Sequence, residues 1–380
     1  MLPLNVAIDG RALGSGHGGD ETYTAGLLEG LASVAAENDR FPVFLKPGAE
    51  LPASIAGHPA FPVYRLRRQN EIRRYLVSLP RALRGLAPPV DALHCLIHAP
   101  LRPRVNVALQ VTDLSFQHWP RYFPLRHRLR LRTLVPIHVR QARVVMTLSE
   151  FCRRDLMRTF DLPAERVFAI PCLVRPPRPP GSSAETERVL ARHGIRRPFF
   201  IYLGNRHPRK NLPRLVQAFR LARSSHPEPA GFQLVLAGAA WWNGGGEDRD
   251  VRLAPPGTIQ VLDRLPDDER DLVVRAATAL VYPSIFEGFG LPPLEAMAIG
   301  TPVLASNAAA LPETLGNAAL LVDPFDVAAM ANALVRLASD AALRADLRQR
   351  GLRHAAQFTA RRCGEAAVAA FRVASQGGWN

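Results

Sequence analysis

The chain has 380 residues, 47% of them apolar, which is enough for two domains with separate cores. The absence of any run of about 18 apolar residues excludes a membrane-spanning helix, and the first residues predict a strand rather than a signal peptide. The net charge of +15 favours an anionic partner: nucleic acid, anionic lipid or a phosphorylated substrate. The cysteines lack metal-ligand spacing and are expected to be free thiols in a reducing cytoplasm: Cys95, Cys152, Cys172 and Cys363.

The first predicted strand, residues 4–9, is followed by a glycine-rich segment and by a predicted helix over residues 21–36. A strand, a glycine loop and a helix in this order form the usual layout of a phosphate-binding site. The letters GSGHGG at residues 14–19 match G-x-G-x-x-G, but the match begins several residues after the strand. A flexible turn is the alternative interpretation.

Short apolar runs predict the remaining strands of the first half. Ser149 is the expected N-cap of a helix over residues 150–160, because its hydroxyl can accept a bond from a free backbone N–H. The predicted strands cover residues 41–44, 61–64, 91–97, 105–111 and 144–148.

Two arginine-rich segments interrupt these strands. Residues 65–84 contain seven arginines and one acid, and residues 122–143 contain many arginines and no acid, with leucine, valine and isoleucine between them. Basic amphipathic helices of this kind lie on anionic membrane surfaces, although a solvated helix face is the alternative. Nucleic acid is not expected as the partner, because base stacking requires interleaved aromatic residues.

A proline-rich linker at residues 174–183 precedes a second predicted domain. Its first strand, residues 199–203, leads into GNRHPRKN, in which Arg206, Arg209 and Lys210 stand just before a helix. Guanidinium and ammonium groups at a strand end suit a diphosphate, and a solvated turn is the alternative. Further along, residues 248–250 spell a metal-binding D-x-D in a glycine-rich stretch, which we interpret as a chance match.

Residues 279–305 predict a strand, a glycine loop, a helix over residues 291–299 and a further strand. This unit places a helix N-terminus and two carboxylates, Glu287 and Glu295, beyond the end of a parallel strand, where ligands bind. A carboxylate repels phosphate, so these acids are better suited to accept hydrogen bonds from hydroxyls, as on a sugar. The alternative is a helix-capping acid at Glu295 and a solvated loop acid at Glu287.

The segment FEGFGLPPLEAMAIGTPVLAS, residues 286–306, resembles the E-x7-E segment of retaining glycosyltransferases of family 4. The resemblance implies an α/β fold of the GT-B type, with two Rossmann-like parallel-sheet domains facing a cleft. It implies an acceptor-binding domain at residues 1–173, a linker at 174–185, a nucleotide-sugar domain at 186–357 and a last helix at 358–380 that returns to the first domain.

In that family the first glutamate contacts the donor sugar and the second the ribose, roles that would fall on Glu287 and Glu295. Lys210 matches the phosphate-binding lysine, while Asn205 stands where the family has arginine, so that Arg206 or Arg209 would take its role. The other donor-binding residues implied by the resemblance are Gly18, Gly19, Leu265, Gly288, Phe289, Gly290 and Leu291.

VTDLSFQHWPRYFP, residues 111–124, resembles the family's HDL turn, which lies near the reaction centre. Thr112 replaces the usual histidine, which is a departure from the family. Asp113 and His118 are therefore the catalytic candidates of the first domain. His118 is the candidate replacement for the missing histidine, and an ordinary polar surface residue is the alternative.

The overall pattern resembles bacterial exopolysaccharide mannosyltransferases. It implies a retaining, metal-independent transfer of mannose from GDP-mannose to a polyprenyl-diphosphate-linked oligosaccharide, without a cofactor. We expect a cytoplasmic protein at the inner face of the membrane. The alternatives are a UDP-sugar-dependent transferase with another acceptor and, from a different class, a non-catalytic basic protein that binds membrane or nucleic acid.

Overall fold

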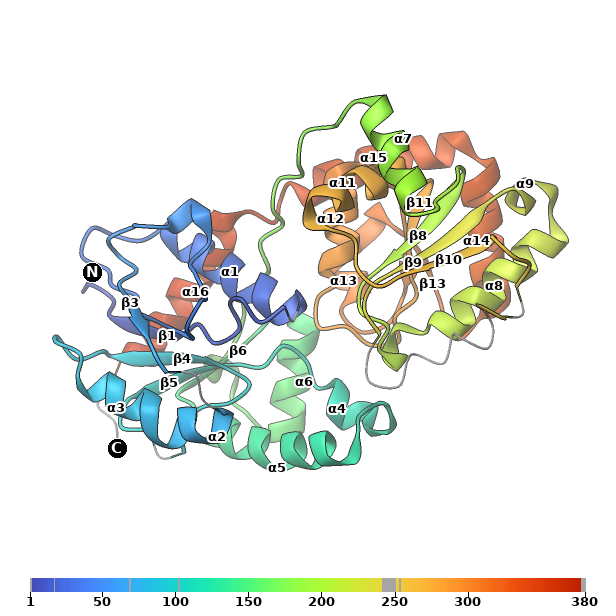
Figure 1. Ribbon diagram of the computed structural model, residues 1–380. Helices are drawn as coiled ribbons and strands as arrows, with labels where there is room; N and C mark the ends of the chain where they lie inside the picture. Colours follow the sequence, from blue (N-terminus) through green and yellow to red (C-terminus); the bar gives the residue numbers. More distant parts are fainter. Residues whose placement is uncertain are drawn as a thin grey trace. The chain divides into compact units, whose positions relative to one another are not determined.

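The computed structural model describes residues 2–16, 18–67, 70–101, 103–240, 251–252 and 254–376. Residue contacts divide the chain into two compact units (Figure 1). The first unit comprises Met1–Leu173 and Phe358–Asn380, and the second comprises Val174–Gln357. The last segment of the chain therefore belongs to the first unit. The D-x-D at residues 248–250 lies outside the described residues.

The first unit is built on a parallel sheet in the order β3-β2-β1-β4-β5-β6-β7, which comprises the seven strands among its described residues. The central strands are short, mostly apolar segments buried on both faces, as is usual in parallel sheets, whereas the edge strand β3 is largely exposed. Their bounds are β1 Val6–Asp9, β2 Val43–Leu45, β3 Val63–Arg65, β4 Ala92–Leu96, β5 Asn106–Gln110, β6 Val144–Thr147 and β7 Val167–Ala169.

The helices of this unit are α1 Gly18–Ala32, α2 Glu71–Arg73, α3 Leu79–Arg84, α4 Ser115–His118, α5 Leu125–Gln141, α6 Glu150–Phe160 and α16 Ala360–Ser375. Ser149 caps α6 as predicted, since its Oγ accepts from the Cys152 N–H at 3.2 Å. The helix predicted over residues 21–36 begins earlier and ends earlier than expected. Gly18 and Gly19 form its first turn rather than part of a loop, because Thr22 Oγ1 and Thr24 Oγ1 bond back to the carbonyls of Gly18 and Asp20.

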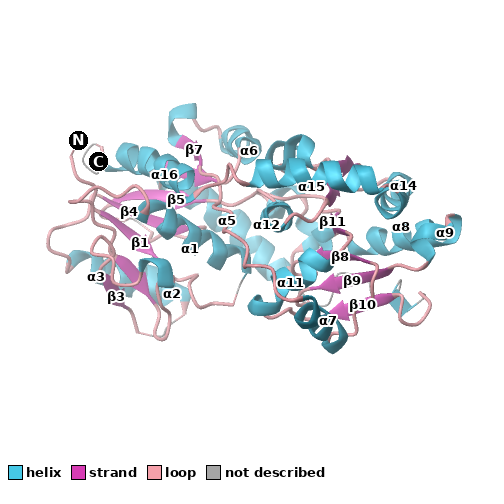
Figure 2. Cartoon of the chain, turned by 90° about the horizontal axis from the view of Figure 1, so that it is seen from above, coloured by secondary structure: helices cyan, strands magenta, loops and turns pink. Residues whose placement is uncertain are grey.

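The second unit has a parallel sheet in the order β10-β9-β8-β11-β12-β13 within its described part. Figure 2 shows β8, β9 and β10 side by side. The strands are β8 Phe199–Leu203, β9 Gln233–Ala237, β10 Ile259–Leu262, β11 Ala279–Tyr282, β12 Val303–Ser306 and β13 Leu320–Val322. The helices are α7 Ser183–Arg192, α8 Leu212–Ser225, α9 Pro227–Ala230, α11 Asp267–Ala276, α12 Leu291–Ile299, α13 Leu311–Leu315, α14 Val327–Ser339 and α15 Ala341–Ala355.

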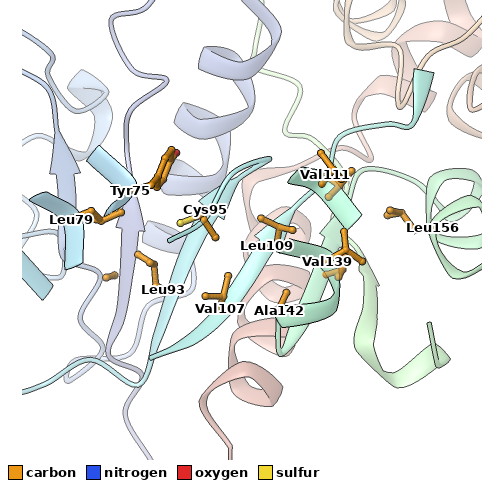
Figure 3. Packing of buried hydrophobic residues seen from close by; sticks show 14 of the residues in the cluster. Tyr75, Leu79, Leu93, Cys95, Val107, Leu109, Val111, Val139, Ala142 and Leu156 are labelled. Carbon is orange, nitrogen blue, oxygen red and sulfur yellow. The ribbon is translucent and has the colours of Figure 1, made fainter. Parts of the chain in front are cut away.

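The core of the first unit includes a continuous cluster between its sheet and the helices on one face (Figure 3). Leu93, Val107 and Leu109 project from the strands and meet Leu79 of α3 and Val139 of α5. These side chains are fully or almost fully buried. The hydrophobic gain from this burial fixes α3 and α5 on the sheet and sets where their polar residues lie.

Helix α16 packs directly against α1 in the same unit (Figure 1). Two glycines make this approach close, because Gly30 and Gly364 face each other with backbone against backbone. A Cβ at Gly30 would lie 3.0 Å from the Gly364 nitrogen and 3.1 Å from the Ala360 oxygen. The glycines are therefore a packing requirement of this helix pair.

We predict that Gly364→Ala lowers the free energy of unfolding by roughly 2 kcal/mol, because the added methyl would overlap the Gly30 carbonyl and force the helices apart. Denaturant unfolding measures the effect. The control is Gly85→Ala, where a new Cβ would come no closer than 3.5 Å to the Ala82 oxygen and 4.0 Å to the Arg81 oxygen among the described residues. Equal stability of the two variants would contradict this account of the α1–α16 contact.

Candidate active site

The candidate site of the second unit lies where β8 and β11 end. These strands pair in parallel, Ala279 opposite Phe200, so their carboxyl ends share one edge of the sheet. The loop after β8 contains the short 3-10 turn Pro208–Lys210. His207 caps this turn, since its Nδ1 accepts from the Arg209 N–H at 3.1 Å. The sequence therefore presents Arg209 and Lys210 from a fixed turn rather than from an open loop.

The loop after β11 is held against that turn by backbone hydrogen bonds. The Ile285 N–H donates to the Arg209 carbonyl at 2.8 Å, and Asn211 Nδ2 donates to the Pro283 carbonyl at 3.1 Å. Gly290 has a φ of 103°, and a Cβ there would lie 2.5 Å from Leu311 Cδ2. Glycine is therefore required where the loop turns into α12, as the sequence predicted.

An ion cluster joins the two loops. Lys210 Nζ lies 2.6 Å from Glu287 Oε1 and donates to the Tyr282 hydroxyl at 2.6 Å. Arg209 Nη1 lies 3.3 Å from Glu287 Oε2 and donates to the Phe286 carbonyl at 2.8 Å. The Lys210 and Glu287 side chains are only 7% and 8% exposed, so this is a buried ion pair.

The cluster keeps Glu287 ionised. Burial alone would raise the pKa of Glu287, but Arg209 and Lys210 outweigh burial and lower that pKa from 4.5 to about 2. Burial and the Glu287 charge raise the pKa of Tyr282 well above its usual value, so that its hydroxyl stays protonated. Two cations and one anion thus leave net positive charge beside the N-terminus of α12.

The other predicted residues of this unit do not join that ion cluster. Glu295 lies one helical turn into α12, where its Oε2 is 3.8 Å from Arg270 Nη1 of α11. Burial raises the pKa of Glu295, although Arg270 opposes the shift. Arg206 lies toward β9 and β10, with its Nη2 3.9 Å from Asp263 Oδ1, so Arg209 is the arginine that joins Lys210. The predicted donor-binding residues Leu265 and Phe289 are buried, and Gly288 and Leu291 flank the loop–helix junction.

The predicted residues of the first unit follow β1 and β5. Asp113 Oδ1 accepts from the Ser115 N–H at 2.8 Å, which shapes the turn into α4. His118 Nε2 lies 2.9 Å from both oxygens of the buried Asp155, so His118 is oriented by a carboxylate rather than being an isolated surface residue. Among the described residues, no atom lies within 4 Å of an added Cβ at Gly18 or Gly19, where α1 begins.

Three residues near the site of the second unit escaped the sequence analysis. Tyr282, the last residue of β11, accepts from Lys210 and has the lysine ammonium 4.9 Å from its ring centre. Asn211 fastens the two loops, and Arg270 pairs with Glu295. A polar atom on the last residue of a buried strand, just before a glycine loop, is the pattern that points to Tyr282.

No group of three or more potential metal-ligating acids, histidines or cysteines was found among the described residues. No helix in that part of the chain is long and apolar enough to cross a bilayer.

Comparison with known proteins identifies the family of this chain. Residues 185–354 match the model of glycosyl transferases group 1. The chain is 32% identical over 270 residues to O-antigen chain mannosyltransferase B of Escherichia coli, covering 69% of this chain and 68% of that protein. The chain belongs to the group 1 glycosyltransferases. Another relative, O-antigen chain mannosyltransferase RfbU of Salmonella typhimurium, is 25% identical over 55% of this chain and 54% of its own length.

Solved structures identify the fold of this glycosyltransferase as GT-B. The structure of WaaG, a glycosyltransferase involved in lipopolysaccharide biosynthesis, matches with a TM-score of 0.71 at 17% identity, covering 95% of this chain and 98% of that chain. Sucrose-phosphate synthase from Thermosynechococcus elongatus matches with a TM-score of 0.70 at 20% identity, covering 97% and 98%. The predicted fold of two Rossmann-like parallel-sheet units is confirmed.

The lowered pKa of Glu287 predicts that the free energy of unfolding decreases at acid pH. Because the pKa falls from 4.5 to about 2 on folding, the ionised pair stabilises the protein above pH 4.5, and this contribution is lost as the pH falls through 2. The full contribution is roughly 3 kcal/mol by the usual conversion of pKa shifts.

Denaturant unfolding of the wild type and of Glu287→Gln between pH 6 and pH 2 measures this contribution. The difference between the two proteins should shrink toward low pH, whereas Glu185→Gln, at an exposed acid of α7, should show no such trend. A constant difference across this range would contradict the buried ion pair.

Proposed function

We propose that this glycosyltransferase moves mannose from GDP-mannose to a lipid-diphosphate-linked oligosaccharide, with retention of the anomeric configuration. The observation that carries the proposal is the buried cluster of Lys210, Arg209 and Glu287 beside the N-terminus of α12. The names of the two O-antigen mannosyltransferases support mannose and a polysaccharide acceptor.

The reaction requires stabilisation of a departing nucleoside diphosphate, and fixed positive groups achieve this most effectively when they need no rearrangement. Lys210 is oriented by Tyr282 and Glu287, and Arg209 by the Phe286 carbonyl. With the free N–H groups at the start of α12, these cations can neutralise the leaving diphosphate without a metal ion. Hydroxyls of the sugar would bond to the Glu287 carboxylate, whose charge Lys210 already balances.

In the proposed chemistry, the bond between the anomeric carbon and the diphosphate oxygen breaks, and the acceptor oxygen attacks from the same face. The departing phosphate takes the proton of the acceptor hydroxyl. Glu295, whose Oε2 faces Arg270, would bind the ribose hydroxyls, and Leu265 would line the base site. On the acceptor side, Asp155 would orient the His118 imidazole, whose Nε2 lies 2.9 Å from its carboxylate. Asp113 would shape the adjoining turn.

We predict that Lys210→Ala and Glu287→Ala each lower the rate of mannose transfer at least about 100-fold, because the first removes a cation that balances the leaving diphosphate and the second removes the carboxylate that binds the sugar hydroxyls and orients Lys210. Transfer from GDP-mannose is measured with the purified, folded protein in the presence of EDTA. The charge-matched control is Arg353→Ala, at an exposed residue of α15, which should retain full activity.

The same assay separates the alternatives. Transfer from UDP-sugars but not from GDP-mannose would replace the proposed donor, and activity lost in EDTA would refute metal independence. Neither transfer nor hydrolysis of any nucleotide sugar by the wild type would favour a non-catalytic binding protein. A thermal-shift comparison of GDP, UDP and ADP sugars gives an independent measure, since a bound ligand raises the melting temperature.

A basic apolar surface of the first unit supports a membrane-bound acceptor. We define this surface by α2, α3, the turn between them, and α5. Arg73, Arg81, Arg84, Arg126 and Arg132 are exposed on it. It also exposes large aliphatic side chains, namely Ile72 (70%), Leu76 (54%), Val77 (53%), Leu125 (59%) and Leu129 (56%). Exposed aliphatic and basic residues together suit the interface of an anionic bilayer.

We predict that the protein binds anionic vesicles and that binding weakens with salt, because exposed charges are screened. Replacing Leu125 and Leu129 together by alanine should weaken binding about tenfold through lost apolar contact with the bilayer. Co-sedimentation with vesicles measures both effects. The control is the double alanine variant of Leu221 and Leu352, which are exposed to 41% and 40% in the second unit. Absence of binding to anionic vesicles at low salt would contradict the proposed membrane-binding surface.

A further inference from the structure

Positive charge is concentrated at the edge of the first-unit sheet where β1 and β4 end. Arg11 lies two residues after β1, and its Nη2 donates to the Leu96 carbonyl at the end of β4, at 3.1 Å. Its Nη1 lies 2.7 Å from Glu71 Oε1, while Arg130 Nη1 of α5 lies 2.8 Å from Glu71 Oε2. One carboxylate therefore holds two guanidinium groups, from two separate elements, at its two oxygens.

A strained turn places a histidine beside these arginines. After β4, the His98 N–H donates to the Leu96 carbonyl at 2.7 Å, and Ile97 between them has a φ of 64°. A β-branched residue is rarely found in this left-handed conformation, and such strain gathers at functional sites. His98 is 5% exposed, and its Nδ1 has no hydrogen-bond partner within the described part of the chain.

The surroundings of His98 are cationic. Burial and then, in order of effect, Arg11, Arg130, His138 and His127 together lower the pKa of His98 from 6.5 to about 3. The imidazole is therefore neutral at physiological pH and can donate one N–H. The cations that act on it would attract an anion to the same place.

We propose that Arg11, His98 and Arg130 bind a phosphate group of the acceptor, which displaces the Glu71 carboxylate from the two guanidiniums. This inference rests on the proposed function and specifies the acceptor side of it. The diphosphate of such an acceptor carries two negative charges and four non-bridging oxygens, against one charge and two oxygens in a carboxylate, and arginine binds both groups in the same forked geometry.

The geometry favours this assignment over a purely structural ion network. Glu71 is 39% exposed, so it can turn toward solvent when a stronger anion arrives. A structural network would account for the contacts of Glu71, but not for the strained turn at Ile97 or the buried Nδ1 of His98. The position, beyond the carboxyl ends of adjacent parallel strands, is where ligands of such sheets bind.

The test compares three variants in mannose transfer to a short-chain prenyl-diphosphate-linked oligosaccharide. Arg130→Ala should raise the acceptor KM about tenfold or more, as loss of a charge-assisted hydrogen bond does. Glu71→Gln should lower the acceptor KM several-fold, because the competing carboxylate is gone. Arg158→Ala, an equal charge change at an exposed residue of α6 in the same unit, is the matched control and should leave KM nearly unchanged. The KM for GDP-mannose should not change in any variant.

Two results would overturn the proposal. One is an equal rise of the acceptor KM in Arg130→Ala and Arg158→Ala. The other is a rise in Glu71→Gln, which is the outcome that a structural ion network requires. An oligosaccharide without the diphosphate gives a further check, since Arg130→Ala should not affect its transfer. A tenfold loss with that acceptor too would also contradict a phosphate subsite.

A direct binding measurement tests the phosphate site independently of whether the proposed mannose transfer is found. Calorimetric titration with inorganic pyrophosphate, in saturating GDP, should show binding that Arg130→Ala weakens, Glu71→Gln strengthens and Arg158→Ala leaves intact, even if no mannose transfer is found. Equal pyrophosphate binding by wild type and Arg130→Ala would refute the site.

Anionic vesicles distinguish an acceptor phosphate from a lipid headgroup. Vesicle binding should fall by the same factor in Arg130→Ala and Arg132→Ala if both residues only contribute charge to the basic apolar surface. A selective loss in Arg130→Ala would assign the site to a headgroup and overturn the acceptor assignment.

Discussion

The buried ion pair between Lys210 and Glu287 is the interaction on which the second-unit site depends. Two charges removed from water carry a large desolvation penalty, so such pairs seldom add much net stability, whereas loss of one partner leaves an uncompensated buried charge. The pair is better understood as a geometric constraint. It joins the loops after β8 and β11, which the Asn211 side chain and the Ile285 N–H also fasten, so the ammonium group has one position relative to α12.

Parallel topology explains why residues far apart in sequence meet there. Lys210 and Glu287 are separated by 77 residues, but their strands are neighbours in the sheet and end at the same edge. The sheet therefore brings the cations Arg209 and Lys210, the Glu287 carboxylate and a helix N-terminus together before any ligand arrives. Electrostatic catalysis requires this preorganisation, because cations that had to move into place would lose much of their effect.

Short-range patterns allowed much of this fold to be predicted from the sequence. Helix α12 was predicted with its observed bounds, since Gly290, the two prolines and Gly300 mark its ends within a dozen residues. Pairing between distant segments was not predictable in this way. We had inferred that Glu287 would repel phosphate, but two cations compensate its charge. Similarly, Gly18 and Gly19 suggested a loop, whereas in the structure they form the first turn of α1. The Thr22 and Thr24 hydroxyls donate to the carbonyls of Gly18 and Asp20 in that turn.

The two units share an architecture but differ in how the charges beyond their strand ends are paired. In the first unit, Asp9 at the end of β1 is buried and bonded to Arg74 and to the Tyr75 hydroxyl, so its charge is balanced inside the core. Arg11, only two residues on, bonds instead to the partly exposed Glu71. An anion that reaches this edge meets guanidiniums whose partner can leave, whereas an anion in the second unit meets cations whose partner is fixed. An ion pair whose carboxylate can be displaced suits a ligand that binds and departs unchanged. An ion pair whose carboxylate stays fixed suits a leaving group whose negative charge develops during the reaction.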